Sequence, residues 1–512
     1  MNDGQIANEA RRRRTFAIIS HPDAGKTTLT EKLLLYGGAI ELAGAVKARK
    51  GHRSTASDWM AIEQQRGISV SSTVLRFEYR DTVINLLDTP GHRDFSEDTY
   101  RVLTACDAAL MVLDAAKGIE DQTRKLLAVC RRRGVPIISF ANKVDRPGLE
   151  PLELLDQIET EMGMAASPVT WPVGANGVFE GLFDRTQRSF VRFTRTARGA
   201  TAAEEHEVPW DDAPVDDASR ARCDDELDLL DGAGAGLDAT AFRESRVTPV
   251  FFGSALSNFG VRHILDAVVD MAPPPGAWTT LDGDARPVEA PFSGFVFKMQ
   301  ANSDPAHRDR IAYLRVCSGR FQRGENITIE RTGKQVTTRH AHLPFGQERH
   351  ALEDAYPGDV VGLVNAANLR IGDTLHDGPP VAYPPIPAFA PELFANARSS
   401  SARAWSSWTR RAWCRCSTAP CARTRCRCSP RWARCSSRWR CTGCARSSAR
   451  RSSWIRPARR SPAASTPGMR RRWNARASPR SSGPPATRSP CSTASTSSTA
   501  SRGGSRTWSC GI

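Results

Sequence analysis

Between residues 15 and 271, short runs of apolar residues alternate with longer stretches in which apolar residues recur every three or four positions. Continuous apolar runs predict strands buried on both faces, and the longer period predicts amphipathic helices. Strands that alternate with helices favour a mostly parallel sheet with helices on both faces, an α/β domain. The strand candidates are Phe16–Ile19, Val83–Leu87, Pro136–Ala141 and Val250–Phe252, and the helix candidates are Leu29–Tyr36, Gln122–Arg132 and Pro151–Met162.

The pattern changes to a period of two from Phe292 onward. Phe295 and Phe297, and later Ile327 and Ile329, alternate with other residues. Short strands separated by turns at this spacing predict a small closed β-barrel. The turn signals are Ser318-Gly319, Arg323-Gly324, Pro357-Gly358 and Ile371-Gly372.

Local changes in composition along the chain indicate where its domains begin and end. Trp171–Gly174 and Ser189–Phe193 predict additional strands, and the acidic stretch Glu204–Asp231 predicts an exposed, partly helical insertion. Met271–Gly276 ends a helix and opens a linker. We therefore expect a first domain at 1–275 with a subdomain inserted at about 165–245, a barrel at 288–383, a linker at 384–398 and a separate tail at 399–512.

A phosphate-binding loop is predicted between the first strand and the first helix. Its glycine lets the backbone approach a phosphate, and the loop amides and the helix N-terminus supply positive potential. Lys26 is expected to reach the β- and γ-phosphates, and Thr27 to place its hydroxyl on Mg²⁺. The loop residues are Ser20 (where glycine is usual), His21, Pro22, Asp23, Ala24, Gly25, Lys26, Thr27 and Thr28.

The end of a second strand candidate supplies groups for the γ-phosphate. Val83–Leu87 is followed by Asp88, Thr89, Pro90, Gly91 and His92. An acid at the C-terminal end of a strand is suited to the outer shell of the metal, and the Gly91 amide can donate to a γ-phosphate.

The ends of two further strand candidates indicate which base is bound. Pro136–Ala141 is followed by Asn142, Lys143, Val144 and Asp145, and Val250–Phe252 precedes Ser254, Ala255 and Leu256. A carboxylate at Asp145 accepts from both the ring N–H and the exocyclic amine of guanine, a pair that adenine lacks, so it selects GTP over ATP. Asn142 is expected to connect this loop to the phosphate loop, and the Lys143 stem to cover the base. The backbone after the last strand can contact the guanine oxygen.

Each of these motifs occurs by chance in many chains, but four of them in this order, each at a strand end, predict a GTPase domain. The residues within and around these motifs also resemble those of a known protein family. Asp88–His92 resembles the translational GTPases, in which histidine replaces the glutamine of Ras-like proteins. The segments Glu31–Ile40, Ser57–Met60, Gln65–Ser72 and Phe95–Tyr100 resemble the class II peptide chain release factors within the elongation factor G-like group. Asp304–Arg310 resembles the signature of the translation-factor barrel, and the resemblance spans about residues 11–397.

This resemblance implies an activity and its participants. It implies ribosome-stimulated hydrolysis of GTP to GDP and phosphate, which promotes dissociation of codon-reading class I release factors from the ribosome. Catalytic roles are implied for Lys26, Gly91 and His92, with His92 orienting the attacking water. Mg²⁺ bound with GTP would contact Thr27 and Ser69 directly and Asp88 through water. The implied partners are ribosomal RNA and proteins, for a cytoplasmic monomer that does not bind membranes. Another elongation factor G-like ribosomal GTPase remains an alternative.

From Leu393 the composition changes abruptly. This stretch contains 26 of the 71 basic residues and none of the 55 acidic ones, so the preceding residues carry a net charge of about −10. It also holds 10 of the 14 Cys and eight of the 12 Trp. Taken literally, it suggests an arginine-rich RNA-binding tail, or a metal site that uses Cys414, Cys416, Cys426, Cys428, Cys441 and Cys444.

A shifted reading frame explains more of this composition. Ser406–Ser417 can be encoded so that a one-base shift yields Glu-Gln-Leu-Asp-Glu-Glu-Gly-Val-Val-Gln-Val-Leu, an acidic amphipathic stretch of the kind that begins the third domain of the family. The single Trp codon and two Cys codons constrain this fit. We therefore predict a frame-shifted tail that starts near Ala397 or Arg398. Apolar residues there are too scarce to stabilise a core, so the sequence predicts no ordered third domain.

Other features of the first 390 residues are ordinary. No apolar run approaches the roughly 20 residues of a membrane span. Cys106, Cys130, Cys223 and Cys317 lack disulfide spacing, which fits a reducing cytoplasm. The basic run Arg11–Arg14 is expected to be a solvated face, with contact to ribosomal RNA as the alternative.

Overall fold

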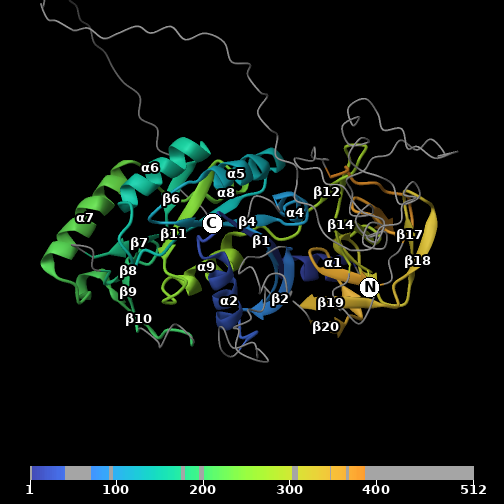
Figure 1. Ribbon diagram of the computed structural model, residues 1–512, viewed down its shortest axis with the longest axis horizontal. Coiled ribbons are helices and arrows are strands. Elements are labelled where there is room, and N and C mark those ends of the chain that lie inside the picture. The colour runs from blue at the N-terminus through green and yellow to red at the C-terminus, as the bar shows by residue number, and fades with distance from the viewer. Residues whose placement is uncertain are drawn as a thin grey trace, which may run out of the picture. The chain divides into compact units, whose positions relative to one another are not determined.

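The computed structural model of the protein describes residues 3–40, 71–91, 96–174, 179–194, 201–301, 310–345, 348–364 and 368–386. These residues form an α/β domain followed by a curled antiparallel β domain (Figure 1). Several residues singled out in the sequence lie outside the described ones: Ser57–Met60, Ser69, His92, Asp304–Asp309 and the tail from Leu393.

The α/β domain is built on a seven-stranded sheet in the order β2-β3-β1-β4-β5-β11-β6. Neighbouring strands are parallel except β2, which pairs antiparallel with β3. This confirms the predicted mostly parallel sheet, although β2, β4 and β6 were not among the strand candidates. The strands are β1 (Arg13–Ser20), β2 (Thr73–Tyr79), β3 (Thr82–Asp88), β4 (Ala108–Asp114), β5 (Ile137–Asn142), β6 (Ala165–Pro168) and β11 (Val247–Gly253).

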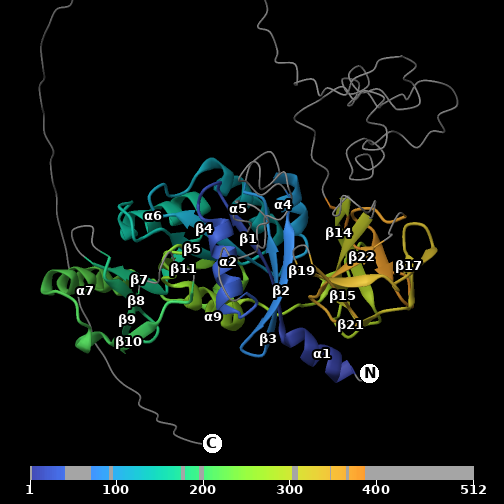
Figure 2. The same ribbon diagram turned by 60° about the horizontal axis from the view of Figure 1, so that its bottom comes forward.

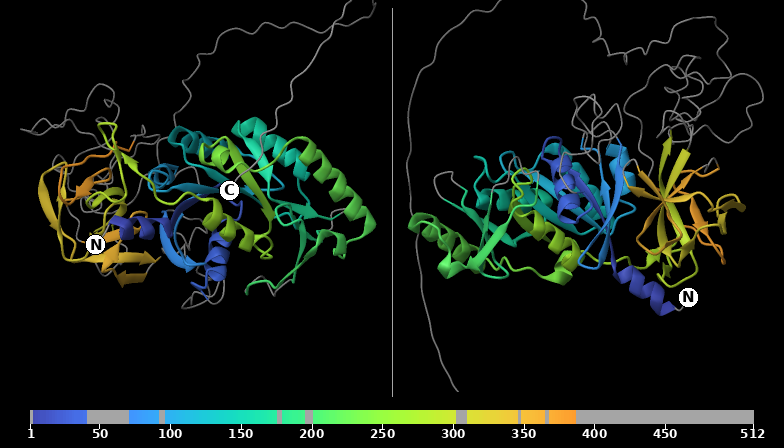
Figure 3. Two further views of the ribbon diagram at one scale, coloured as in Figure 1. Left: turned by 180° about the vertical axis from the view of Figure 1, so that it is seen from behind. Right: turned by 90° about the horizontal axis from the view of Figure 1, so that it is seen from below.

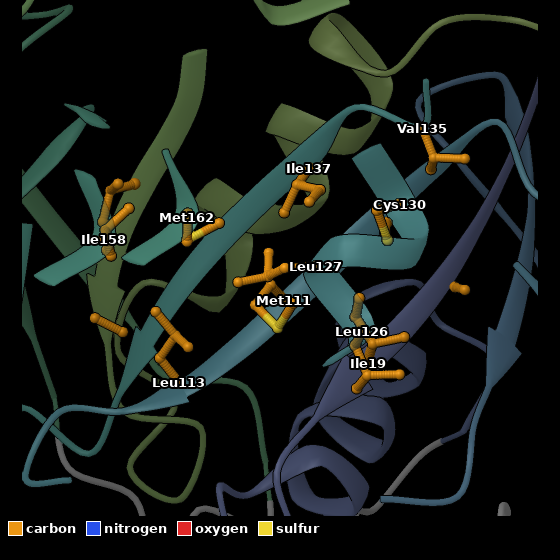
Figure 4. Packing of buried hydrophobic residues seen from close by; sticks show 14 of the residues in the cluster. Ile19, Met111, Leu113, Leu126, Leu127, Cys130, Val135, Ile137, Ile158 and Met162 are labelled. Atoms are coloured by element: carbon orange, nitrogen blue, oxygen red, sulfur yellow. The ribbon is translucent and has the colours of Figure 1, made fainter. Parts of the chain in front are cut away.

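Helices cover both faces of this sheet, because successive strand residues point to opposite sides. Ile18 belongs to the buried cluster that includes α2 and α9, whereas Ile19 packs with Leu126 of α5. Figure 2 shows α5 and α6 on one side of the sheet and α9 on the other, and Figure 4 shows the packing beneath α5. The helices are α1 (Asp3–Arg11), α2 (Lys26–Tyr36), α4 (Ser96–Val102), α5 (Asp121–Arg133), α6 (Pro151–Met162) and α9 (Val261–Met271).

A second, four-stranded antiparallel sheet is inserted between α6 and β11, in the order β10-β9-β8-β7. Helix α7 lies along it (Figure 3), and the indole N–H of Trp171 donates to Glu226 of this helix at 2.8 Å. The elements are β7 (Thr170–Val173), β8 (Gly181–Asp184), β9 (Ser189–Phe193), β10 (Glu205–Pro209), the 3-10 turn η3 (Trp210–Asp212), α7 (Asp217–Gly232) and α8 (Ala239–Arg243).

As expected, the stretch Glu204–Asp231 is partly helical and mostly exposed, but a few of its residues are buried within the inserted subdomain. β10 pairs with β9, and Trp210, Cys223 and Leu227 are buried. Most acidic residues of α7 are exposed, although Glu226 accepts from Trp171 of the sheet, and the buried Cys223, Leu227 and Leu230 recur at helical spacing. The helix is therefore amphipathic.

The second domain is an eight-stranded antiparallel sheet in the order β18-β17-β23-β14-β15-β22-β19-β20. Its turns use Gly319, Gly324, Gly358 and Gly372, all at positive φ, as the turn signals predicted. The strands are β14 (Ser293–Ala301), β15 (Arg310–Ser318), β17 (Asn326–Ile329), β18 (Lys334–Thr337), β19 (Ala341–Phe345), β20 (Glu348–Ala351), β22 (Val360–Val364) and β23 (Thr374–His376). Two short ribbons accompany them, β12 (Trp278–Thr279) with β13 (Ala285–Arg286), and β16 (Phe321–Gln322) with β21 (Asp354–Ala355).

The alternating residues of β14 are buried on both sides of the strand, which the sequence did not indicate. Val296 lies in the core of the second domain with Ile327 and Ile329. Phe295 and Phe297, on the other side of the strand, join the cluster that continues into the α/β domain. Both faces of this strand are therefore buried, one in the barrel-like core and one between the domains.

Buried polar contacts also join the two domains. Arg13 donates to Asp359 at 2.9 Å, and Thr15 Oγ1 donates to the Gly358 carbonyl at 2.7 Å. Arg315 Nη2 donates to both carboxylate oxygens of Asp107, at 2.7 and 2.8 Å. The expectation that Arg11–Arg14 forms a solvated face was wrong for Arg13, which is 3% exposed because it connects the domains.

Candidate functional site

The predicted phosphate loop connects the end of β1 to the start of α2. Ser20 ends the strand, Lys26 begins the helix, and Gly25 precedes it at φ +98°. A Cβ on Gly25 would lie 2.2 Å from Nδ2 of Asn142, so only glycine fits both the backbone angle and the space. The glycine thus lets a neighbouring loop approach the phosphate loop closely.

Asn142 connects three of the four predicted motifs. Its Nδ2 donates to the Ala24 carbonyl at 2.7 Å, which is the connection to the phosphate loop that we expected. Its Oδ1 accepts from the amides of Lys143 and Ala255, both at 2.9 Å. The side chain is 2% exposed, so these bonds are shielded from water and fix the three loops relative to one another.

A cavity of about 320 Å³ opens between these loops. Its lining contains most of the predicted nucleotide-binding residues and one that was not predicted, Arg146. The lining residues are Ser20, His21, Pro22, Asp23, Gly25, Lys26, Thr27, Thr28, Gly91, Asn142, Lys143, Asp145, Arg146, Ser254 and Leu256. Ala24, Asp88, Thr89, Pro90, Val144 and Ala255 lie in the same motifs without lining it.

Asp145, at one end of the cavity, has one carboxylate oxygen that is free to accept a hydrogen bond from a ligand. Its Oδ2 accepts from the Ser257 hydroxyl at 2.8 Å, whereas its Oδ1 is buried without a hydrogen-bond partner among the described residues. A buried acceptor without a donor is costly, so this oxygen favours a ligand that brings an N–H group. Guanine presents such donors.

Lys143 crosses the same end of the cavity. It adopts φ +71°, and its ammonium donates to the Asp23 carbonyl at 2.6 Å and to Asp114 at 2.7 Å. These contacts extend its stem over the phosphate loop. Leu256, 49% exposed, lies at the rim of the cavity.

A buried ion pair lies next to the other end of the cavity. Lys26 Nζ lies 2.6 Å from Oδ1 of Asp88, and both side chains are almost inaccessible to solvent. Thr89 donates to the Ile18 carbonyl at 2.6 Å, which holds the start of this loop against β1. Gly91 lies close to Ser20 and Pro22, so its backbone faces the phosphate loop.

The residues present fit a magnesium ion that arrives with a phosphate ligand. Thr27 supplies a hydroxyl in the cavity, and Asp88 supplies a carboxylate beside it. Hard oxygen donors, few in number and supplemented by phosphate oxygens and water, are what Mg²⁺ prefers in nucleotide sites. The third residue predicted for the metal, Ser69, lies outside the described residues, as does His92.

Sequence reasoning missed several residues at this site. Asp114 ends a fully buried apolar run, the same strand-then-acid pattern that identified Asp88, so this signal was present. Glu120, 3.2 Å from His21 Nε2, and Ser257 had no comparable signal, because their roles depend on loops folding together.

Comparisons with known proteins agree with this geometry. The sequence profile of the Elongation factor Tu GTP binding domain matches residues 11–274, and that of Elongation factor G domain 2 matches residues 291–378. The chain is 54% identical over 403 residues to Peptide chain release factor 3 of Gloeobacter violaceus, covering 78% of this chain and 76% of that protein. The protein of the same name from Nitrosomonas europaea is 53% identical over 394 residues, covering 76% and 74%.

Solved structures show the same architecture. A crystal structure of a protein from Thermus thermophilus matches with a TM-score of 0.60 and 26% sequence identity. The match covers 78% of this chain and 60% of that one, so the chain spans well under the full length of that protein.

Proposed function

The chain belongs to the peptide chain release factor 3 family, and on that premise we propose that it is a GTPase of translation termination. It binds GTP, hydrolyses it to GDP and phosphate on the ribosome, and thereby promotes dissociation of codon-reading class I release factors. The observation that carries this proposal is the connection made by Asn142, because it assembles the phosphate loop and the base-recognition loops around one cavity.

GTP hydrolysis requires mainly positioning and charge stabilisation. In the proposed mechanism, Lys26 leaves Asp88 and binds the β- and γ-phosphates, while Asp145 accepts from guanine. Thr27 and Ser69 would hold the magnesium ion, with Asp88 behind a water molecule. The ion would supply neutralisation of phosphate charge. The Gly91 amide would donate to the γ-phosphate, and His92 would orient the attacking water.

The partners follow from the same premise. We propose that the protein interacts with ribosomal RNA and proteins, with class I release factors and with GTP and GDP, as a monomer in the cytoplasm. Within the described residues, no helix is long and apolar enough to cross a membrane.

Fluorescent-nucleotide titration and a ribosome-stimulated hydrolysis assay test this proposal on the full chain. Lys26→Ala removes a charge-assisted phosphate contact, which contributes about 1.5–3 kcal/mol, so GTP affinity should fall at least tenfold. His92→Ala should leave GTP binding within about twofold of wild type and abolish stimulation by ribosomes.

Two results would contradict the proposal. If the wild-type protein does not bind GTP, the assignment of the nucleotide-binding site is wrong. Stimulated hydrolysis combined with translocation in a toeprinting assay, without release-factor dissociation, would instead identify another elongation factor G-like GTPase.

A further inference from the structure

A buried cation from the second domain contacts the α/β domain next to its nucleotide site. Lys298 of β14 is 2% exposed, and its ammonium donates to the Ser72 carbonyl. It also lies 3.9 Å from the Asp98 carboxylate and 5.3 Å from the ring centre of Tyr313. The β14–β15 register shifts between Val296 and Lys298, so an irregularity in the strand directs this side chain away from the regular pleat.

The two residues that Lys298 contacts, Ser72 and Asp98, are also bound to each other. Asp98 Oδ2 accepts from both the amide and the hydroxyl of Ser72, each at 2.7 Å. One carboxylate oxygen thus receives two hydrogen bonds and lies beside a buried positive charge. Because a buried charge is costly unless it is compensated, the three groups stabilise one another.

Each acceptor adjoins a segment assigned to the γ-phosphate. Ser72 directly precedes β2 and follows Ser69 closely in sequence, the residue proposed for the metal. Asp98 belongs to α4, the helix that follows Gly91. The cluster of Ser72, Asp98 and Lys298 therefore joins the flanks of both segments to one strand of the second domain.

Other described polar contacts between the domains lie elsewhere on the sheet, including those of Asn85 and Arg76 with Asp359. Arg13 and Thr15 occupy the beginning of β1, and Asp107 directly precedes β4. The phosphate loop follows the opposite end of β1, at Ser20. Contacts at the amino ends of these strands connect the domains without touching the flanks of the γ-phosphate segments, which makes them suitable controls.

We propose that Lys298 is a positioning residue that couples γ-phosphate binding to the docking of the second domain, through its shared contact with Ser72 and Asp98. This inference rests on the proposed function. A γ-phosphate bound between these two segments would hold Ser72 and Asp98 in place for Lys298. By thermodynamic reciprocity, the docked second domain favours GTP over GDP to the same extent.

The test compares affinities for GDP and for a non-hydrolysable GTP analogue, both measured by fluorescent-nucleotide titration on the full chain. Lys298→Met preserves length and apolar packing but removes the charge, so the ratio of analogue to GDP affinity should fall by about tenfold. Asp98→Asn should lower the same ratio. The double variant should be no worse than the more affected single variant, because both changes remove one shared contact.

Thr15→Val is the matched control. It removes the buried hydroxyl that donates to Gly358 at the same domain boundary, and it should leave the affinity ratio within twofold of wild type. Circular dichroism and melting temperature establish that each variant is folded. Lys298→Arg, which keeps the charge, should retain more of the wild-type ratio than Lys298→Met does.

An unchanged ratio in folded Lys298→Met would overturn the inference, as would an equal fall in Thr15→Val. If wild type binds GTP and responds to ribosomes, and Lys298→Met behaves identically, only the proposed coupling is refuted. Loss of GTP binding by wild type would refute the proposed function itself.

Discussion

Asp145 illustrates how neighbours set the chemistry of one side chain. Its two carboxylate oxygens are not equivalent, since Ser257 donates to Oδ2 while no described residue donates to the buried Oδ1. The hydroxyl fixes the orientation of the carboxylate before any ligand arrives. Preorganised acceptors lose less free energy on binding than mobile ones, so Ser257 should sharpen base discrimination.

Asp145→Asn should reverse this discrimination. The amide offers a donor where guanine requires a second acceptor, so GTP affinity should fall at least tenfold and XTP, with its extra carbonyl, should compete better. Competition titrations with GTP and XTP measure the preference. Ser257→Ala serves as the milder comparison, with a loss of a few-fold and no gain for XTP. An unchanged GTP preference in Asp145→Asn would place the base elsewhere.

At the scale of elements, the start of α2 depends on Gly25. Gly25→Ala should impair both folding and nucleotide binding, because a left-handed backbone costs an L-residue about 1–2 kcal/mol and the new Cβ would meet Asn142. We expect a melting temperature several degrees lower and GTP affinity reduced at least tenfold. Gly38→Ala is matched for backbone strain, at φ +69°, but its Cβ would meet no atom of the described residues within 4 Å. It should lose stability with little loss of affinity; equal affinity losses would mean that the contact with Asn142 is unimportant.

The packing of α9 against the inserted sheet introduces a pH dependence. His263 lies 3.6 Å from Asp184 of β8, and burial lowers the pKa of His263 even though Asp184, Asp266 and Glu207 favour its charged form. Arg262 acts in the same direction as burial. A lowered pKa means that the unfolded chain binds a proton more readily, so stability should fall as pH decreases below about 6.5.

Urea unfolding at pH 7.5 and 5.5 tests this effect. The free energy of unfolding of wild type should fall more steeply with acidification than that of His263→Gln, by up to about 1.4 kcal/mol per pH unit. His206→Gln, at an exposed position of β10, is the control and should retain the wild-type slope. Identical slopes in wild type and His263→Gln would exclude His263 as the cause.

At the scale of the whole molecule, Arg315 joins the two domains. It is fully buried, and its Nη2 donates to both carboxylate oxygens of Asp107. Burial raises the pKa of the Asp107 carboxyl even beside this arginine. Arg315→Leu leaves a buried carboxylate without its partner, which should reduce the free energy of unfolding by about 3–5 kcal/mol. The guanidinium also lies 5.5 Å from the ring centre of Trp278, one of the 12 tryptophans that contribute to the fluorescence of the chain.

Denaturant titration followed by tryptophan fluorescence measures the effect. Arg323→Leu removes the more exposed ion pair with Glu353 and should change stability by about 1 kcal/mol or less. Similar losses in the two variants would show that Arg315 contributes no more than a surface charge.

Much of the first domain could be predicted from the sequence, because buried parallel strands require continuous apolar runs and the loops after them carry chemically distinctive residues. Phe16–Ile19, Val83–Leu87 and Val250–Phe252 all lie in strands of one sheet, and most predicted loop residues line one cavity. In the inserted subdomain, two of the four strands and a partly helical segment could be predicted, but the burial of Leu227 against the sheet could not.

The sequence by itself determined the class of each domain, the positions of several turns and the identity of the phosphate and base loops, since these depend on local periodicity and on residue type. Only the tertiary structure decided which groups meet across long separations. It turned Arg13 from a surface charge into a domain contact, paired Ser257 with Asp145, and brought Lys298 to Ser72. Such contacts depend on how whole elements pack, and local sequence carries no signal for a partner that lies hundreds of residues away.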